Sequence, residues 1–322
     1  MAVHQGSLGS CYFHASIAAL AQAVPGTLRS AITGDAATGY HVHFFSGPDE
    51  LVYQEDVEYA RTQGFDHSDG RWVTVIMRAY AQRQLRQSMV NAINNSTLIP
   101  IFAKPVALSA LDQSGPLLVA YDRAIRSVVS QDGTIDKAAF KDQLTTQLGA
   151  LGIPAMQAQL LIGFLEQGGF YEALAQTVRD NGEVFGAYRS FGRGGVPKSV
   201  LEAFVGKANQ GSIAETNAAV IEQLLIRKHV EGLAMVAGTR TTPPNAAGAA
   251  PIPPDAPAGV KPPDWWVASH AYTVLDYDQS KGLVTLRNPW GGRPAPDGVF
   301  TLPLVAFLQA YQNYAVASRV AE

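Results

Sequence analysis

The sequence predicts an α+β fold with room for two lobes or domains, and three features indicate it. The chain of 322 residues is 47% hydrophobic and 16% charged, which is a globular composition with enough length for two lobes. An Ala-rich segment near the N-terminus carries apolar residues at helical spacing. The last third contains short alternating runs bounded by Gly and Pro, which is typical of strands.

The N-terminal third is expected to alternate between helix and strand. Apolar spacing predicts a helix over residues 12–32, which Pro25-Gly26 interrupts. Alternation predicts strands over Tyr40–Phe45 and Leu51–Tyr53. A further helix, Trp72–Ala81, has an apolar stripe typical of a buried core face.

Residues 83–180 form a different, predominantly helical block. The predicted helices are Arg83–Asn95, Leu108–Val129, Lys137–Leu151, Met156–Gln167 and Phe170–Arg179. The apolar run within this block is interrupted by Pro154 and Gln157, so it does not predict a membrane span.

The C-terminal part is expected to be rich in strands. We predict a short helix before Gly206, a helix over 217–228, strands over 233–237, 269–277 and 283–287, and a last helix over Leu304–Tyr314. Residues 241–263 contain 8 prolines in 23 residues and predict an extended, flexible loop. This loop precedes His270, so it either borders a cleft, where it could gate the site or be cut by the enzyme itself, or forms a solvated insertion.

Composition narrows the function classes. A net charge of −3 gives no basic field for nucleic acid or an anionic membrane surface. The single cysteine excludes an intramolecular disulfide framework and a Cys-rich zinc site. No signal-peptide pattern precedes Cys11. The Ala-rich composition suggests a bacterial domain, delivered or secreted as an effector, and the chain is expected to be part of a longer protein.

The segment Gln5–His14 holds the only cysteine at a predicted helix start. Free N–H groups and the helix dipole there favour a thiolate, so a lowered pKa is expected for Cys11. Gln5 is close enough to turn an amide donor toward the same point, as an oxyanion hole requires. The alternative interpretation is a small buried cysteine at a helix start.

His270 and Asn288 supply the partners that a thiol nucleophile needs. They lie at the start of one predicted strand and the end of the next, so an antiparallel hairpin brings them together. His270 could take the thiol proton, and the Asn288 amide could hold the imidazole in one tautomer. Trp290 could cover that hydrogen bond. His270 alone would be read as a surface histidine in a hairpin.

These segments resemble the protease core of calpains, a family of papain-like cysteine peptidases. The resemblance covers about 1–82 and 185–322 and rests on several motifs. They are Gln5-Gly-Ser-Leu-Gly-Ser-Cys11, Tyr40–Phe45, Trp72–Ala81, Gly194-Gly195 with Phe204-Val-Gly206, Gly232–Thr239, His270-Ala-Tyr-Thr-Val and Leu286-Arg-Asn-Pro-Trp-Gly291.

The resemblance implies a papain-like two-lobed fold, with residues 1–82 and 181–322 as the protease core and 83–180 as a helical insertion. It implies a cysteine endopeptidase in which Cys11 attacks peptide bonds, with Gln5 and the Cys11 N–H at the oxyanion. His270 acts as base and Asn288 as its orienter.

The resemblance also implies a substrate site in which Gly194 and Gly195 pair with an extended protein chain beside Ser269. Ser269 stands where calpains carry Gly, which restricts the approach of substrate backbone. No metal site is predicted. Calcium is expected only by resemblance, and its candidate ligands are scattered: Asp49-Glu50, Glu55-Asp56 and Asp66–Asp69.

Two other functions remain open. A Cys–His site on this fold can also carry out deamidation or transglutamination of protein Gln, although Asn288 in place of Asp favours hydrolysis. The chain could instead be a latent protease domain that binds a partner. The insertion 83–180 has no counterpart in the family core and is the expected surface for such a protein partner.

Overall fold

A computed structural model of the chain describes residues 3–95, 104–105, 115–128, 136–150, 154–156, 158–159, 162–163, 188–242, 266–292, 295 and 297–318. The fold is a mixture of α and β with two sheets, as the α+β prediction requires. Of the helix predicted at 156–167, residues 156, 158–159 and 162–163 are described, and they are helical. The helix predicted at 170–179 and most of the Pro-rich loop lie outside the described residues.

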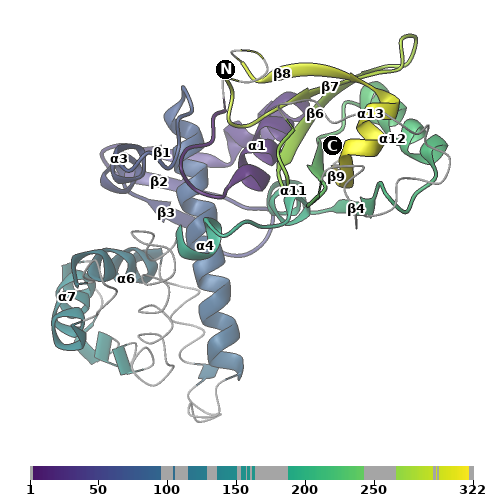
Figure 1. The fold of residues 1–322 in the computed structure, drawn as a ribbon. Helices are drawn as coiled ribbons and strands as arrows, with labels where there is room; N and C mark the ends of the chain where they lie inside the picture. Colours follow the sequence, from purple (N-terminus) through teal and green to yellow (C-terminus); the bar gives the residue numbers. More distant parts are fainter. Residues whose placement is uncertain are drawn as a thin grey trace.

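The N-terminal half combines helices with a small antiparallel sheet (Figure 1). Its strands, in the order β1-β2-β3, are Ile32–Asp35, Gly39–Val42 and Glu50–Val52. Its helices are α1 (Cys11–Ala23), α2 (Pro25–Ser30), α3 (Gln54–Thr62) and α4 (Arg71–Asn95). Two short helices from later in the chain, α10 (Tyr188–Phe191) and α11 (Pro197–Val205), pack onto the same core.

The helical segment predicted over 12–32 is divided at Pro25, as its Pro25-Gly26 interruption predicts, and its last residue already belongs to a strand. α1 ends at Ala23, Pro25 starts α2 at the position where proline is tolerated, and Ile32 already begins β1. Helix α3 was not predicted, because its segment is mostly polar and buries only the two apolar residues Val57 and Ala60.

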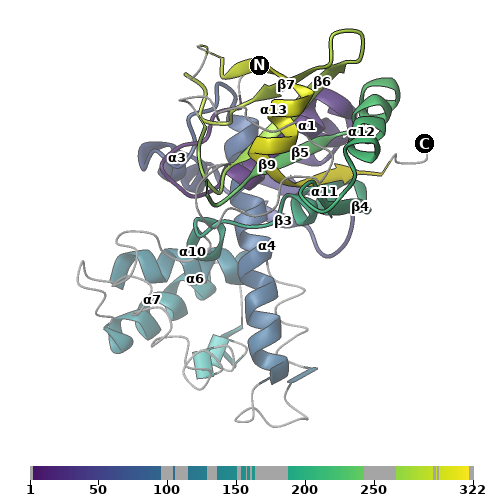
Figure 2. The ribbon, with the colours of Figure 1, turned by 45° about the vertical axis from the view of Figure 1, so that its right-hand side comes forward.

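The C-terminal half is a six-stranded antiparallel sheet in the order β4-β9-β5-β6-β7-β8. The strands are β4 (Ala208–Ser212), β5 (Met235–Thr239), β6 (Ala271–Asp278), β7 (Leu283–Arg287), β8 (Val299–Pro303) and β9 (Tyr311–Ala317). Helices α12 (Ala218–Glu231) and α13 (Leu304–Ala310) share a core with one face of this sheet. Figure 2 shows α12 and α13 beside the sheet.

The helix predicted over Leu304–Tyr314 is wrong in its second half. α13 ends at Ala310, and Tyr311 is already extended, with φ −106° and ψ 146°. β9 then pairs with β4 on one side and β5 on the other. These two ladders satisfy the backbone of a segment that sequence periodicity alone assigned to helix.

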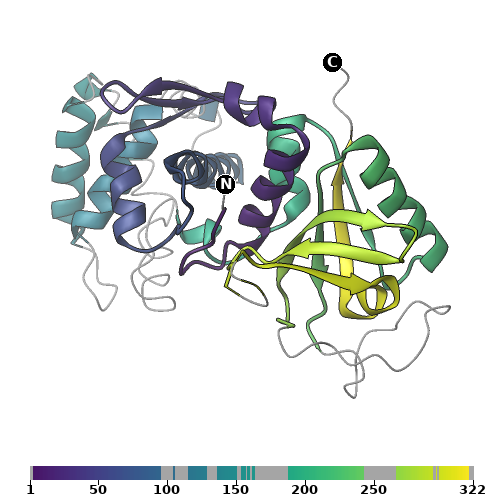
Figure 3. The same ribbon diagram turned by 90° about the horizontal axis from the view of Figure 1, so that it is seen from above.

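Helix α1 joins the two halves by lying against the opposite face of the large sheet (Figure 3). Its small side chains Ala15 and Ala19 share a core with Ala271 and Ala315 of the strands. Small residues on both surfaces let the helix approach the sheet closely. Thr273 on β6 fixes this approach, because its hydroxyl donates to the carbonyl of Ala15 at 2.8 Å.

Helix α4 runs without a break through the predicted boundary at 82/83, so the insertion grows out of a core helix. The described part of the insertion includes α6 (Gly115–Val128) and α7 (Lys137–Ala150), which meet through the edge-to-face rings of Tyr121 and Phe140. Ion pairs tie α6 to the core: Arg78–Asp122 at 2.7 Å and Arg123–Asp56 at 3.3 Å. Within the described ranges, no helix combines the length and apolar character that a membrane crossing requires.

Candidate active site

Cys11 is the first residue of α1. The chain before it approaches another segment closely: the N–H of Gly9 donates to the carbonyl of Gly192 at 3.2 Å, and a Cβ on Gly9 would lie 2.6 Å from that oxygen. Ser10 does not cap the helix, because its hydroxyl lies 3.1 Å from Nδ1 of His14. The thiol therefore sits at an uncapped helix start that a glycine contact holds in place.

The pKa of the Cys11 thiol is raised, contrary to the expectation from its place in the helix. Burial is the largest cause, because it penalises the thiolate. Backbone N–H groups of Ala271, Tyr12 and Cys11 itself oppose this rise but do not outweigh it. The thiol therefore holds its proton at neutral pH and needs a base to become a nucleophile.

His270 precedes β6 directly and is buried. Thr239 on the neighbouring strand fixes its backbone: the N–H of His270 donates to the Thr239 hydroxyl oxygen at 2.9 Å, and the N–H of Thr239 donates to the carbonyl of His270 at 2.9 Å. The residue before it, Ser269, is the only non-glycine residue of the described chain with a positive φ, at 52°. The turn that presents His270 thus depends on an unfavourable backbone conformation.

Asn288 fixes the orientation of the imidazole. Its Oδ1 lies 2.9 Å from Nε2 of His270 and accepts a second hydrogen bond from the N–H of Trp290 at 3.0 Å. Because this oxygen accepts from Trp290, Nε2 of His270 carries the proton and Nδ1 is the basic nitrogen. The Trp290 ring lies over the imidazole, 4.3 Å between centroids, although the indole is 48% exposed.

Burial lowers the pKa of His270 to about 4, although the hydrogen bond that its Nε2–H donates to Asn288 acts to raise it. Replacing Trp290 with Ala admits water to the ring, so we expect the His270 pKa to rise toward 6.5. Replacing Asn288 with Ala removes the interaction that favours the charged form, so the pKa should fall further. NMR titration of the His270 ring protons measures both shifts. Shifts in the same direction for the two variants would contradict this assignment of causes.

Gln5 lies beside the Asn288 loop, and its side-chain amide already makes one hydrogen bond within the protein. Its backbone N–H donates to the carbonyl of Pro289 at 2.8 Å, which joins the segment before Cys11 to the loop that follows Asn288. Its amide Nε2 donates to the carbonyl of Leu8 at 2.6 Å. A primary amide has a second N–H, and the hydrogen bond to Leu8 leaves that N–H unused.

A cavity of about 330 Å³ opens between the two halves, and Cys11 and His270 both line it. Gly194, Gly195 and Ser269, the residues that the sequence assigns to substrate binding, also line this cavity. A Cβ on Gly195 would lie 2.5 Å from the ring of Tyr12, so only glycine fits there. Gln5, Asn288 and Trp290 are not lining residues: the Asn288 and Trp290 side chains contact the imidazole, and Gln5 contacts the Leu8 carbonyl.

Ser269 provides a test of the strained turn. Ser269→Gly should raise the free energy of unfolding by about 0.5–1 kcal/mol, because glycine adopts a positive φ without the Cβ clash. Urea unfolding measures the change. The control is Ser199→Gly in α11, where the loss of helix propensity should destabilise the protein. If both variants are destabilised equally, Ser269 is not strained.

A buried network beside the Gln5–Cys11 segment has no counterpart in the sequence predictions. Nε2 of His14 lies 3.4 Å from Oδ1 of Asp66, and both side chains are fully buried. Asp66 accepts from Ser68 at 2.6 Å and from Thr74 at 2.5 Å, and it forms a β-bridge with Gln5. Although burial acts to raise it, the pKa of Asp66 is lowered, first by its contact with His14 and then by the hydrogen bonds from Ser68 and Thr74. Nothing in the sequence connects residues 14 and 66, so only the fold shows the network.

The acidic residues considered for calcium do not fit such a site. Glu50 forms a bidentate pair with Arg86, with both distances 2.9 Å. Asp49 pairs with His43 at 2.7 Å. Asp56 and Asp66 are engaged as described above, and the described ranges contain no group of three His, Cys, Asp or Glu side chains that could hold a metal ion. The carboxylates of Asp49, Glu50, Asp56 and Asp66 are thus engaged in ion pairs or hydrogen bonds within the protein.

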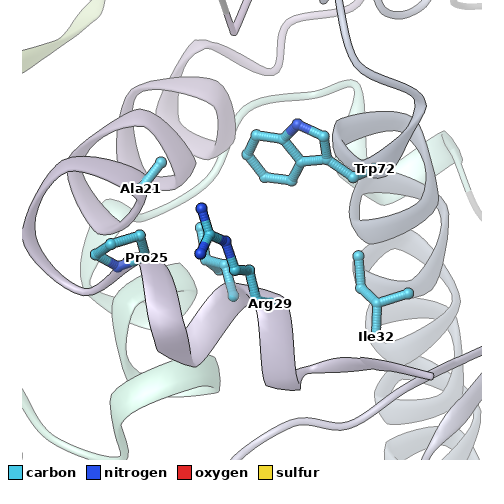
Figure 4. A pocket seen from close by; sticks show the side chains of 6 residues that line it. Ala21, Pro25, Arg29, Ile32 and Trp72 are labelled. Carbon is cyan, nitrogen blue, oxygen red and sulfur yellow. The ribbon is translucent and has the colours of Figure 1, made fainter. Parts of the chain in front are cut away.

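A second cavity, also of about 330 Å³, lies apart from the predicted site (Figure 4). It is mostly apolar and lies among α1, α2, β1 and the start of α4. Its lining residues are Ala21, Pro25, Leu28, Arg29, Ile32 and Trp72. None of the predicted catalytic residues reaches it.

Comparison with known proteins adds no assignment. No family model matches the chain, and no curated protein matches it. The chemistry of the site must therefore be judged from its own residues. The thiol and the neutral, oriented imidazole line the same cavity. With the imidazole as base, a thiol placed there can attack a carbonyl carbon.

Proposed function

We propose that the protein is a cysteine endopeptidase. One observation carries the proposal: a thiol at a helix start and an imidazole held by an asparagine line the same cavity. Cys–His pairs with a third orienting group are the recurrent arrangement for acyl transfer through a thioester. The same observation supports a papain-like two-lobed fold, with Cys11 in the helical lobe and His270 in the β-rich lobe.

In the proposed reaction, Nδ1 of His270 takes the proton of the Cys11 thiol as the sulfur attacks the substrate carbonyl carbon. The C–N bond then breaks, and the imidazolium returns the proton to the leaving amine. Water, deprotonated by the same imidazole, hydrolyses the thioester and restores the thiol. Asn288 keeps Nε2 protonated throughout, so Nδ1 stays the proton acceptor.

The oxyanion would be stabilised by two donors. The backbone N–H of Cys11 lies at the free end of α1, where the helix dipole favours negative charge. The second N–H of the Gln5 amide is the other donor. Backbone at Gly194 and Gly195 would pair with an extended substrate, because both glycines line the cavity and neither carries a side chain of its own.

Deamidation or transglutamination would use the same thiol and base, so the products must distinguish them. Incubation with casein, followed by mass spectrometry, is expected to show fragments with new termini. Intact casein with the small mass gain of amide-to-acid conversion, or cross-linked through glutamine, would favour the alternative chemistry. Unchanged casein would favour a latent, partner-binding domain.

A further inference from the structure

The sheet face that packs on α1 continues beyond the start of the helix and forms part of the cavity. Val236 and Ala315 lie on this face, because both belong to the core that α1 shares. Side chains two residues along a strand point the same way, so Gly238 and Asn313 lie on the same face. Both line the cavity with Cys11.

Asn313 and Gln210 present two amides at this end of the cavity. Asn313 is paired with Gly238 across the ladder, and a Cβ on that glycine would lie 2.4 Å from Oδ1 of Asn313, so the amide occupies the space over the glycine. Gln210 pairs with Ala315, two residues from Asn313 on β9. The two amides are therefore diagonal neighbours, with Cα atoms about 7–8 Å apart, and one ligand group can reach both.

The chemistry of this region selects a neutral, hydrogen-bonding ligand. Among the lining residues that the structure describes, there is no carboxylate, ammonium or guanidinium group, so a charged side chain would lose water without gaining a counter-charge. Gln210 and Asn313 are both exposed, and within the described residues neither side-chain amide hydrogen-bonds to another protein group, so both amides are solvated in the free protein. An apolar side chain would desolvate them without compensation. A primary amide can both donate to and accept from them.

We propose that Asn313 and Gln210 select substrates with a Gln or Asn side chain within two residues of the scissile bond. This inference rests on the proposed endopeptidase function. Ala271 on β6 lies next to the Cys11 thiol. β9 lies two strands from β6, so Asn313 is about 10 Å from Ala271 across the sheet. An extended substrate advances about 3.3 Å per residue. The side chain of its second residue therefore spans that distance.

Cleavage of a peptide library tests the inference. Sequencing the products of the wild-type enzyme should show enrichment of Gln or Asn at one position within two residues of the cut. Asn313→Leu, which is nearly isosteric, should lower kcat/KM for Gln peptides relative to matched Leu peptides about tenfold, the value of one lost hydrogen bond. Enrichment of Leu, Val or Phe in the wild type, or an unchanged profile in Asn313→Leu, overturns it.

The matched control is Asn209→Leu. Asn209 lies next to Gln210 on β4 but points to the opposite face, so this variant should keep the wild-type preference. Binding of the same peptides to Cys11→Ala separates the two hypotheses. If the wild type cleaves nothing, the proposed function fails. The Kd values of Cys11→Ala for the peptides still test the amide preference. A tenfold preference for Gln peptides over Leu peptides supports it, and equal binding rejects it.

Discussion

Hydrolysis of an unfolded protein should fall at least about 10³-fold when Cys11 is replaced by Ala, because no other described side chain in the cavity can form the thioester. His270→Ala should lose a similar amount, since the thiol pKa is raised and the sulfur needs the imidazole to lose its proton. The double variant should be no worse than either single variant, because the two groups act in one step. Initial rates with a fluorogenic casein measure all three.

Control variants separate chemistry from folding. His229→Ala removes an exposed histidine that pairs with Asp276 at 2.5 Å, and its rate should stay within about twofold of the wild type. Thermal unfolding should show that Cys11→Ala keeps its fold. Additive losses in the double variant, or retained hydrolysis by Cys11→Ala, would contradict the roles assigned to these residues.

The largest expected loss of stability comes from the ion pair between the core and the insertion. Arg78 and Asp122 are fully buried and 2.7 Å apart. Although burial disfavours the charged guanidinium, the carboxylates of Asp122 and Asp56 raise the pKa of Arg78. Asp122→Asn leaves a buried cation without its nearest counter-charge, and the free energy of unfolding should fall by about 3–5 kcal/mol. Urea unfolding measures it.

Two control variants show whether the loss of stability comes from the buried, unpaired charge. Glu231→Gln breaks the exposed pair with Arg227, so it should cost less than about 0.5 kcal/mol. The double variant Arg78→Met with Asp122→Leu removes both charges and should be more stable than Asp122→Asn. If Asp122→Asn unfolds like the Glu231 variant, the insertion does not depend on this pair for its docking.

The β-rich side of the candidate site could be predicted from the sequence because it is local. His270, Asn288 and Trp290 belong to one hairpin, and the antiparallel register of β6 and β7 brings them together as expected. Ser269 is a related case. The sequence places a serine directly before the histidine, and the structure shows that this serine adopts a positive φ.

Other properties depend on packing that the sequence does not encode locally. The helix start favours a low thiol pKa, but burial between the two halves reverses the direction for Cys11. The His14–Asp66 contact joins residues with no sequence relation. β9 reads as a helix until its pairing with β4 and β5 is known. In each case a long-range contact outweighs the local preference.

Trapping the acyl-enzyme tests the central claim most directly. The protein is mixed with a peptide ester, quenched in acid within the first turnover, digested and analysed by mass spectrometry. The proposed mechanism predicts a thioester on the peptide that contains Cys11, with the mass of the acyl part of the substrate, and no adduct in Cys11→Ala. An acyl group on any other residue, or equal consumption of the ester by Cys11→Ala, would contradict it.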